Sequence, residues 1–209
     1  MTALRAFAAG RYRLRFLAIA LTTLISIGAA SCASHVQSGA GLSDRLHTSL
    51  HMPDGKEWLT ENLNLDTAES YCFGDRQANC RRYGRLYTWQ SVQRACQLLE
   101  GGWRLPTDDE WRQLASRYGG AYDGTENSGK AAYQALLTGG RSGFNAVLGG
   151  GRAFDDGAYD DLNAHGFYWT ASEIDSAIAL FYNFARGGQT LYRQPDGEKP
   201  LALSARCVR

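Results

Sequence analysis

The sequence lacks an excess of charge of either sign. It has 22 Lys and Arg residues against 21 Asp and Glu residues, which gives a formal net charge of +1. The segment before position 32 contains four basic residues and no acidic residue. The rest of the chain therefore carries 18 bases against 21 acids. A mildly acidic protein without a basic stripe is a poor candidate for nucleic-acid binding, and we expect no nucleic-acid partner.

Internal repeats, alternating strand and helix patterns, and long apolar runs are also missing, apart from one apolar run near the N-terminus. Apolar residues make up 44% of the chain and charged residues 21%, which disfavours disordered, collagen-like and multi-span membrane architectures. A length of 209 residues favours one folded domain. Glycine, by contrast, is abundant, and its 24 residues indicate many turns.

The one apolar run (FLAIALTTLISIGAAS) lies between arginines and a group of small residues. It predicts a signal peptide over residues 1–31, because it is shorter than the roughly 20 apolar residues of a membrane-spanning helix. The small residues before Cys32 resemble the lipobox of bacterial lipoproteins, so we expect Cys32 to be lipidated and the protein to lie at the cell surface. If the cell has two membranes, Ala33 rather than Asp after the lipidated Cys resembles the signal that sorts a lipoprotein to the outer membrane. Cleavage near Ala30 or Ala33, with ordinary secretion, is the alternative.

The residues after this run divide into a linker and a folded part. Residues 32–45 hold the expected lipid-attachment Cys and then small, polar residues, which predict a flexible tether. The folded domain is therefore expected over residues 46–209. At its start, a Pro-Asp-Gly turn separates two short strand patterns, at 46–52 and 56–59.

Four cysteines remain in the domain: Cys72, Cys80, Cys96 and Cys207. An even number of cysteines in an exported chain suggests two disulfides. Three pairings are possible, and the sequence alone does not choose between them. Proximity favours Cys72 with Cys80, which leaves Cys96 with Cys207. A metal site is disfavoured because neither a CxxC motif nor clustered histidines accompany these cysteines.

Helical patterns occupy the middle of the domain, and strand patterns follow them. Trp89, Val92, Cys96 and Leu99 recur at helical spacing, and a capping box at 107–110 begins a second main helix. A weaker pattern indicates a third helix at 130–137. Helices followed by strands, without βαβ alternation, predict an α+β fold. The strands are expected at 144–148, 166–171, 178–185, 190–193 and 201–208.

Ordered motifs rich in Trp, Gly and Cys run through the whole domain. They include Trp58–Asn64, Tyr83–Trp89, Gly102–Thr107, Tyr168–Glu173 and Arg206–Val208. In this order and spacing they resemble the FISUMP (major paralogous) domain family. The resemblance implies a C-type lectin-like fold, in which two main helices flank a twisted antiparallel sheet. It also implies a disulfide from the first helix to the last strand, which agrees with the Cys96 to Cys207 pairing.

The resemblance implies a binding module as well. Relatives of this fold include surface lipoproteins diversified by retroelements, whose variation falls on the last strands and loops. We therefore expect a surface lipoprotein that binds a macromolecular ligand, protein or glycan, without enzymatic activity, cofactor or metal. It would be a candidate for the variable protein of a diversity-generating retroelement.

The expected ligand site lies on the strand at 178–185 and its neighbours. If Ala179 and Phe181 face the core, strand alternation places the residues between them on the outside. Contiguous exposed apolar side chains usually mark an interface, although packing beneath a neighbouring loop is the alternative. The predicted ligand-binding residues are Ile174, Ile178, Leu180, Tyr182 and Tyr192.

Two segments are similar to parts of calcium-binding proteins, but neither predicts a calcium site here. The triplet 194–196 (Gln-Pro-Asp) resembles that of galactose-type calcium lectins but lacks their Trp-Asn-Asp motif, so we predict an ordinary Pro-Asp-Gly turn between two strands. The acidic segment 155–161 does not have the spacing of a known calcium loop. A calcium-dependent carbohydrate lectin is thus an alternative function rather than the expected one.

An enzyme is the other alternative. The segment 104–107 with Glu110 and Trp111 resembles part of the formylglycine-generating oxidases. Their chemistry needs reactive thiols near the C-terminal end, whereas Cys207, the only late cysteine here, is expected in a disulfide.

Overall fold

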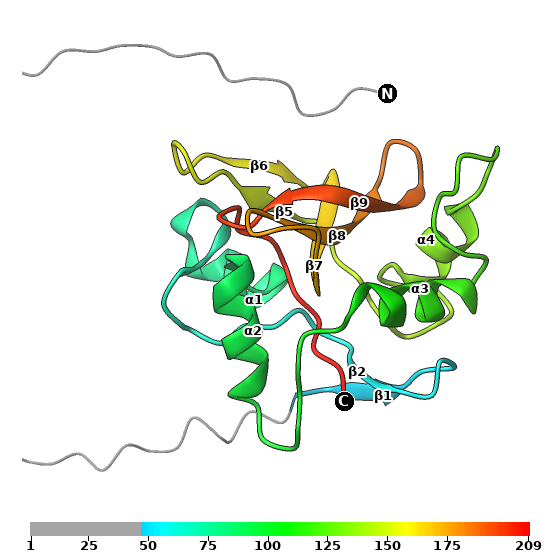
Figure 1. The fold of residues 1–209 in the computed structure, drawn as a ribbon, viewed down its shortest axis with the longest axis horizontal. Coiled ribbons are helices and arrows are strands. Elements are labelled where there is room, and N and C mark those ends of the chain that lie inside the picture. Colours follow the sequence, from blue (N-terminus) through cyan, green and yellow to red (C-terminus); the bar gives the residue numbers. More distant parts are fainter. Residues whose placement is uncertain (1–46) are drawn as a thin grey trace, which may run out of the picture. The chain divides into compact units, whose positions relative to one another are not determined.

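The structure, a computed structural model, describes residues 47–209. The predicted signal peptide, the lipidation site at Cys32 and the tether lie outside the described residues. Within them, helices and strands combine in a mixed fold with a curled sheet, as the α+β prediction requires. In Figure 1, α1 and α2 lie on one side of the sheet and α3 and α4 on the other.

Five strands form the main sheet, in the order β6-β5-β7-β8-β9. Its neighbouring strands run antiparallel except for β5 and β7, which are parallel at the pair Gly150 and Gly166. The predicted strands at 166–171, 178–185 and 190–193 are confirmed, although the first and last are longer than predicted. The bounds are β5 Gly149–Arg152, β6 Tyr159–Leu162, β7 His165–Glu173, β8 Ile178–Ala185 and β9 Thr190–Glu198.

Two small sheets complete the strands. The N-terminal hairpin pairs β1 (Ser49–His51) with β2 (Glu57–Leu59), and β3 (Ser70–Tyr71) pairs with β4 (Leu86–Tyr87). Gly55 allows the tight turn of the hairpin because its φ of 85° lies in the left-handed region. Both strand patterns predicted at the start of the domain are therefore confirmed.

Three helices begin where the sequence predicts them. Thr88 accepts a hydrogen bond from Ser91 N at the start of α2 (Trp89–Gln97), and Thr107 and Glu110 form the predicted capping box of α3 (Asp108–Ser116). The weaker pattern corresponds to α4 (Lys130–Leu136). Helix α1 (Gln77–Tyr83), preceded by a 3-10 turn at Phe73–Asp75, was not predicted because it is short and buries only two side chains. None of the helices in residues 47–209 combines the length and the apolar character needed to cross a membrane.

Both disulfides predicted from proximity are confirmed. Cys72 is bonded to Cys80 of α1, and Cys96 of α2 is bonded to Cys207, 111 residues further along the chain. The first bond holds a short helix that has little apolar surface of its own. The second ties the end of the chain to the helix layer.

Residues 201–209, the C-terminal segment, do not form the predicted strand. The segment is extended and runs beside β2, where Leu59 N donates to the carbonyl of Cys207 and Glu57 N to that of Arg209. Instead of joining one ladder, it makes isolated bridges to several elements, because no single strand lies alongside its whole length. The bridge partners are Trp58, Tyr87, Arg104, Arg152 and Tyr168. The strand predicted at 144–148 is likewise reduced to one bridge, at Ala146.

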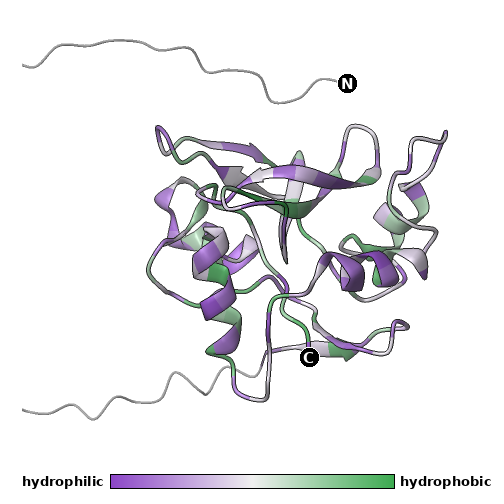
Figure 2. Ribbon diagram, viewed as in Figure 1, coloured by the Kyte–Doolittle hydropathy of each residue, from purple (hydrophilic) through white to green (hydrophobic). Residues whose placement is uncertain are grey.

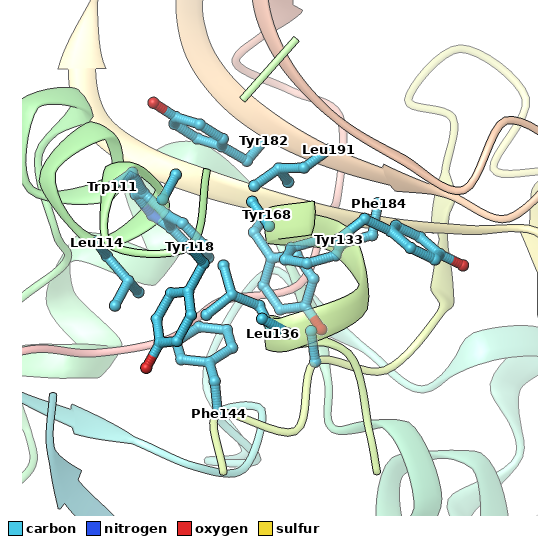
Figure 3. Close-up of a cluster of buried hydrophobic side chains, with 14 of the residues drawn as sticks. Trp111, Leu114, Tyr118, Tyr133, Leu136, Phe144, Tyr168, Tyr182, Phe184 and Leu191 are labelled. Carbon is cyan, nitrogen blue, oxygen red and sulfur yellow. The ribbon is translucent and has the colours of Figure 1, made fainter. Parts of the chain in front are cut away.

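The central strands of the sheet, β7 and β8, are largely buried on both faces by two apolar clusters. One contains Tyr168, Tyr182 and Phe184 of the sheet and packs around Trp111 of α3, as Figure 3 shows. The other contains Trp169 and Phe181 together with residues of α2. Hydrophilic and hydrophobic residues follow one another along the helices in Figure 2, as expected for helices with one buried face.

Candidate functional site

The prediction that Leu180 and Tyr182 face solvent is wrong. Leu180 is 3% exposed and Tyr182 is fully buried. The ring of Tyr182 stacks on that of Trp111, with 5.1 Å between their centroids (Figure 3). Side chains do alternate along β8, but helices or loops cover both faces of the strand, so both sets are buried. These two residues therefore belong to the core and are not available to a ligand.

Asp108, at the start of α3, holds β9 against this core. Its carboxylate accepts two hydrogen bonds from Arg193, of 2.8 and 3.0 Å, and one of 3.1 Å from Arg112. Burial raises the pKa of Asp108, but these hydrogen bonds outweigh it and hold the pKa below its usual value. Tyr182 Oη also donates to Asp108, over 3.2 Å, and burial together with the nearby negative charge raises the pKa of Tyr182. The cluster is a structural link between α3, β8 and β9.

The other predicted ligand-binding residues are accessible but do not form one patch. Ile174 is 56% exposed, while Ile178 and Tyr192 are half-buried. Ile178 pairs with Glu198, whereas Tyr192 pairs with Asn183, at the other end of β8. The ring of Tyr192 packs instead on that of Tyr122, with 5.2 Å between the centroids.

The turn between β7 and β8 forms a surface with the residues that follow β9. Ile174 N donates to the carbonyl of Ile178, and Lys199 N donates to that of Ala177. The ammonium group of Lys199 donates to the Glu173 carboxylate and lies 4.4 Å from the centroid of the Trp89 ring. We call this region, residues 173–178 with Phe154, Lys199 and Pro200, the turn surface.

A shallow pocket of about 250 Å³ opens at the turn surface. Phe154, one of its lining residues, is 49% exposed. The guanidinium of Arg152 lies 4.2 Å from the centroid of the Tyr71 ring, and its Nε atom is buried without a hydrogen-bond partner among the described residues. The pocket is lined by Glu69, Tyr71, Thr88, Gln90, Arg152, Phe154, Lys199 and Pro200.

A larger cleft of about 560 Å³, here called the polar cleft, lies between the end of α1, residues 60–64 and residues 138–147. Sequence reasoning missed it, because its lining comes from segments that are far apart in the chain and have no common motif. The lining residues are Thr48, Thr60, Glu61, Asn62, Asn64, Cys80, Arg81, Arg82, Tyr83, Gly84, Thr138, Asn145, Val147 and Arg206.

Arg206, which lines the polar cleft, is fully buried. Its guanidinium donates to Asn62 Oδ1 and to three backbone carbonyls, those of Leu59, Phe144 and Asn145. Burial lowers its pKa. Within residues 47–209, no carboxylate forms an ion pair with it.

The Gln-Pro-Asp triplet does not form the predicted turn. It lies inside β9, where the register shifts between the pairs Phe181 with Gln194 and Ala179 with Gly197, so Pro195 and Asp196 are accommodated by an irregularity in the edge strand. In the acidic segment 155–161, the side chains of Asp155, Asp156 and Asp160 accept hydrogen bonds from neighbouring backbone N–H groups. In the part of the chain that the structure describes, no group of three or more His, Cys, Asp or Glu residues could hold a metal ion.

The segment that resembles the formylglycine-generating oxidases has a structural role. Arg104 donates two hydrogen bonds to the Glu110 carboxylate, of 2.8 and 2.6 Å, and Thr107 N donates a third of 2.9 Å. Burial raises the pKa of Glu110, but the opposing effect of these bonds is larger and brings the pKa down to about 2. The sulfur atom of Cys207 is bonded to that of Cys96.

Comparison with known proteins gives one match. No curated protein and no solved structure is significantly similar to the chain. The family model described as the Fibrobacter succinogenes major domain, which is the FISUMP-type family, matches residues 47–209. Because this match covers most of the sequence, the chain belongs to the Fibrobacter succinogenes major domain family.

Proposed function

We propose that this chain is a surface lipoprotein whose C-type lectin-like domain binds a macromolecular ligand, protein or glycan, at the turn surface. The lipobox-like residues before Cys32 support the lipid anchor, and the cell surface, at the outer membrane, as its location. Helices on both sides of a curled sheet and the bond from α2 to Cys207 support the lectin-like fold. That bond also supports a role without catalysis, since an oxidase-like mechanism would need the Cys207 thiol.

The observation that carries the proposal is the presence of two exposed apolar side chains on the turn surface, next to charged residues. Ile174 and Phe154 are two of the few large apolar residues with high exposure in the described domain. Phe154 lines the pocket in which Arg152 Nε is buried without a partner among the described residues. Ile174 follows Glu173, whose carboxylate accepts a hydrogen bond from Lys199 of the same pocket. Apolar anchors beside a desolvated charged group are typical of binding hot spots.

The turn surface is remote in the chain from the tether. It lies where β9 ends and β8 begins, and in Figure 1 the β6 to β9 end of the domain is opposite β1, β2 and the C-terminus. The tether would join the domain just before β1. The attachment point of the tether therefore lies at β1 rather than at the turn surface.

The test compares two exposed apolar sites. Wild-type protein is screened against a glycan array and a panel of cell-surface proteins, and each ligand found is titrated with the variants. The double variant Ile174→Ser, Phe154→Ser should bind at least about tenfold more weakly, because hot-spot truncations cost about 2 kcal/mol. Leu98→Ser is the matched control, since Leu98 is 59% exposed at the end of α2. Equal binding by all three proteins contradicts the proposal.

The anchor and the diversification are tested separately. A fatty-acid probe should label the wild type and not Cys32→Ala; equal labelling of both excludes lipidation at this residue. We further propose that the chain is the variable protein of a diversity-generating retroelement. In that case, a template repeat with adenine-specific differences lies beside the gene, and its absence from the locus contradicts this part.

A further inference from the structure

The polar cleft is a second candidate binding site, distinct from the turn surface in position and in chemistry. It shares no lining residue with the pocket of the turn surface. Its volume of about 560 Å³ lies within the range of about 300 to 1,000 Å³ found for ligand pockets. Its lining, however, is dominated by polar and charged side chains, so its chemistry does not suit an apolar ligand.

Neutral hydrogen-bonding side chains surround the cleft. Amide groups both donate and accept hydrogen bonds, as do hydroxyl groups, so they match the hydroxyl groups of a sugar chain. Val147 is the one aliphatic residue among the lining residues, which leaves little surface for the apolar side chains of a peptide. The neutral polar lining residues are Thr48, Thr60, Asn62, Asn64, Thr138 and Asn145.

The cleft also carries an excess of positive charge. Arg81 and Arg82 of α1 are exposed at its lining, and Arg206 is buried, while Glu61 is the one carboxylate among the lining residues. Buried charges are normally paired, because removing an ion from water is costly. The hydrogen-bond partners of Arg206 are neutral oxygens, so its charge is not balanced by contact with a carboxylate in the described domain.

Contacts within the protein constrain one wall of the cleft. Asn62 Nδ2 donates to the carbonyl of Tyr83 over 2.8 Å, and the bond from Cys72 to Cys80 fixes α1. Gly84 has a φ of 76°, and a Cβ atom there would lie 2.5 Å from Cβ of Asn62. A rigid wall limits the ordering cost on binding.

From this arrangement we infer that the polar cleft binds an acidic oligosaccharide. Its sugar carboxylates would face Arg81 and Arg82 within the positive field of Arg206, and its hydroxyl groups would bind the surrounding amide and hydroxyl side chains. Carboxylates bound to arginine form hydrogen bonds stronger than those between neutral groups, so the charged sugars should dominate the affinity.

The experiment uses the mature, full-length protein and isothermal titration at low and high salt. The probes are oligogalacturonate, alginate oligomers and hyaluronan oligosaccharides, with neutral cello- and malto-oligosaccharides and a polyglutamate peptide for comparison. At least one acidic oligosaccharide should bind, more weakly as salt increases, and the neutral sugars and the peptide should not bind comparably. Absence of binding by all three acidic sugars overturns the inference, as does equal binding of neutral sugars or of the peptide.

Variants then locate the site. The double variant Arg81→Ala, Arg82→Ala should weaken binding at least about tenfold, because hydrogen bonds to charged groups are strong. Asn145→Asp, nearly isosteric, adds a negative charge beside Arg206 and should also weaken binding; Asn145 is exposed at a φ of 56°, which Asp tolerates. Arg117→Ala, outside the cleft, is the control. Unchanged affinity in the double variant and in Asn145→Asp overturns the assignment to the cleft, whereas the turn-surface variants should bind the sugar normally.

Discussion

Strand β8 and the C-terminal segment are both almost completely buried, but for different reasons. β8 lies between β7 and β9, and its side chains enter two apolar clusters alternately. The C-terminal segment belongs to no ladder and buries Ser204 and Arg206 as well as apolar residues. Its position depends on a disulfide and on hydrogen bonds to several different strands and loops. Regular pairing stabilises the first, and separate contacts to remote elements stabilise the second.

The largest effect is expected from the bond that fixes the C-terminal segment. Replacing Cys96 and Cys207 together by Ser should cost about 5 kcal/mol in the free energy of unfolding, because the bond closes a loop of more than 100 residues. The Cys72, Cys80 double Ser variant, which opens a much shorter loop, should lose less than about 3 kcal/mol. Urea unfolding of both variants measures the difference, and an inverted order would show that the segment is held mainly by its other contacts.

The next effect concerns β8. Tyr182→Ala removes a ring stacked on Trp111, so it should lower the free energy of unfolding by about 3 to 5 kcal/mol. Tyr182→Phe keeps the ring and loses the hydrogen bond to Asp108, for a cost of about 1 kcal/mol. The comparison uses Ile174→Ser, an exposed change expected within about 0.5 kcal/mol. A small effect of Tyr182→Ala in thermal unfolding would mean that this face of β8 is accessible after all.

A smaller effect should follow from the buried charge of the C-terminal segment. Arg206→Met fills much of the same space but leaves the carbonyls of Leu59 and Phe144 without their donor, so it should cost about 3 kcal/mol. Arg206→Lys restores the charge but not the geometry of the four bonds, and it should recover only part of the loss. Full stability of the Met variant in urea would show that the neutral contacts of the segment suffice.

The smallest effect is expected from Glu110, which connects the C-terminal segment to the helix that covers β8. Glu110 binds Arg104, which bridges to Val208 of the C-terminal segment, and it caps α3, which covers β8. Its pKa is about 2 in the folded state against 4.5 ordinarily, so its stabilising contribution is present above pH 4.5 and is lost as the pH falls towards 2. The stability gap between wild type and Glu110→Gln should therefore narrow over this interval. A gap that does not change with pH in urea titrations contradicts the role of this carboxylate.

The helix starts could be predicted because a capping signal is local in the sequence. The disulfides could be predicted because few pairings are possible. Thr107 and Glu110 satisfy each other within one turn, and four cysteines leave few pairings. Helix α1 and the polar cleft could not be predicted in this way. The first depends on a disulfide rather than on apolar periodicity, and the second on segments that only folding brings together.

By itself, the sequence determined the family, the alternation of side chains along β8 and the residues that cap α2 and α3. Only the tertiary structure decided which of those side chains meet solvent. Alternation assigns residues to two faces of a strand, but a face is exposed only if no other element covers it, and α3, more than 60 residues earlier in the chain, covers Tyr182. For the same reason, the accessible apolar surface lies at the turn before β8, where Ile174 is 56% exposed, and not in the middle of β8 as predicted.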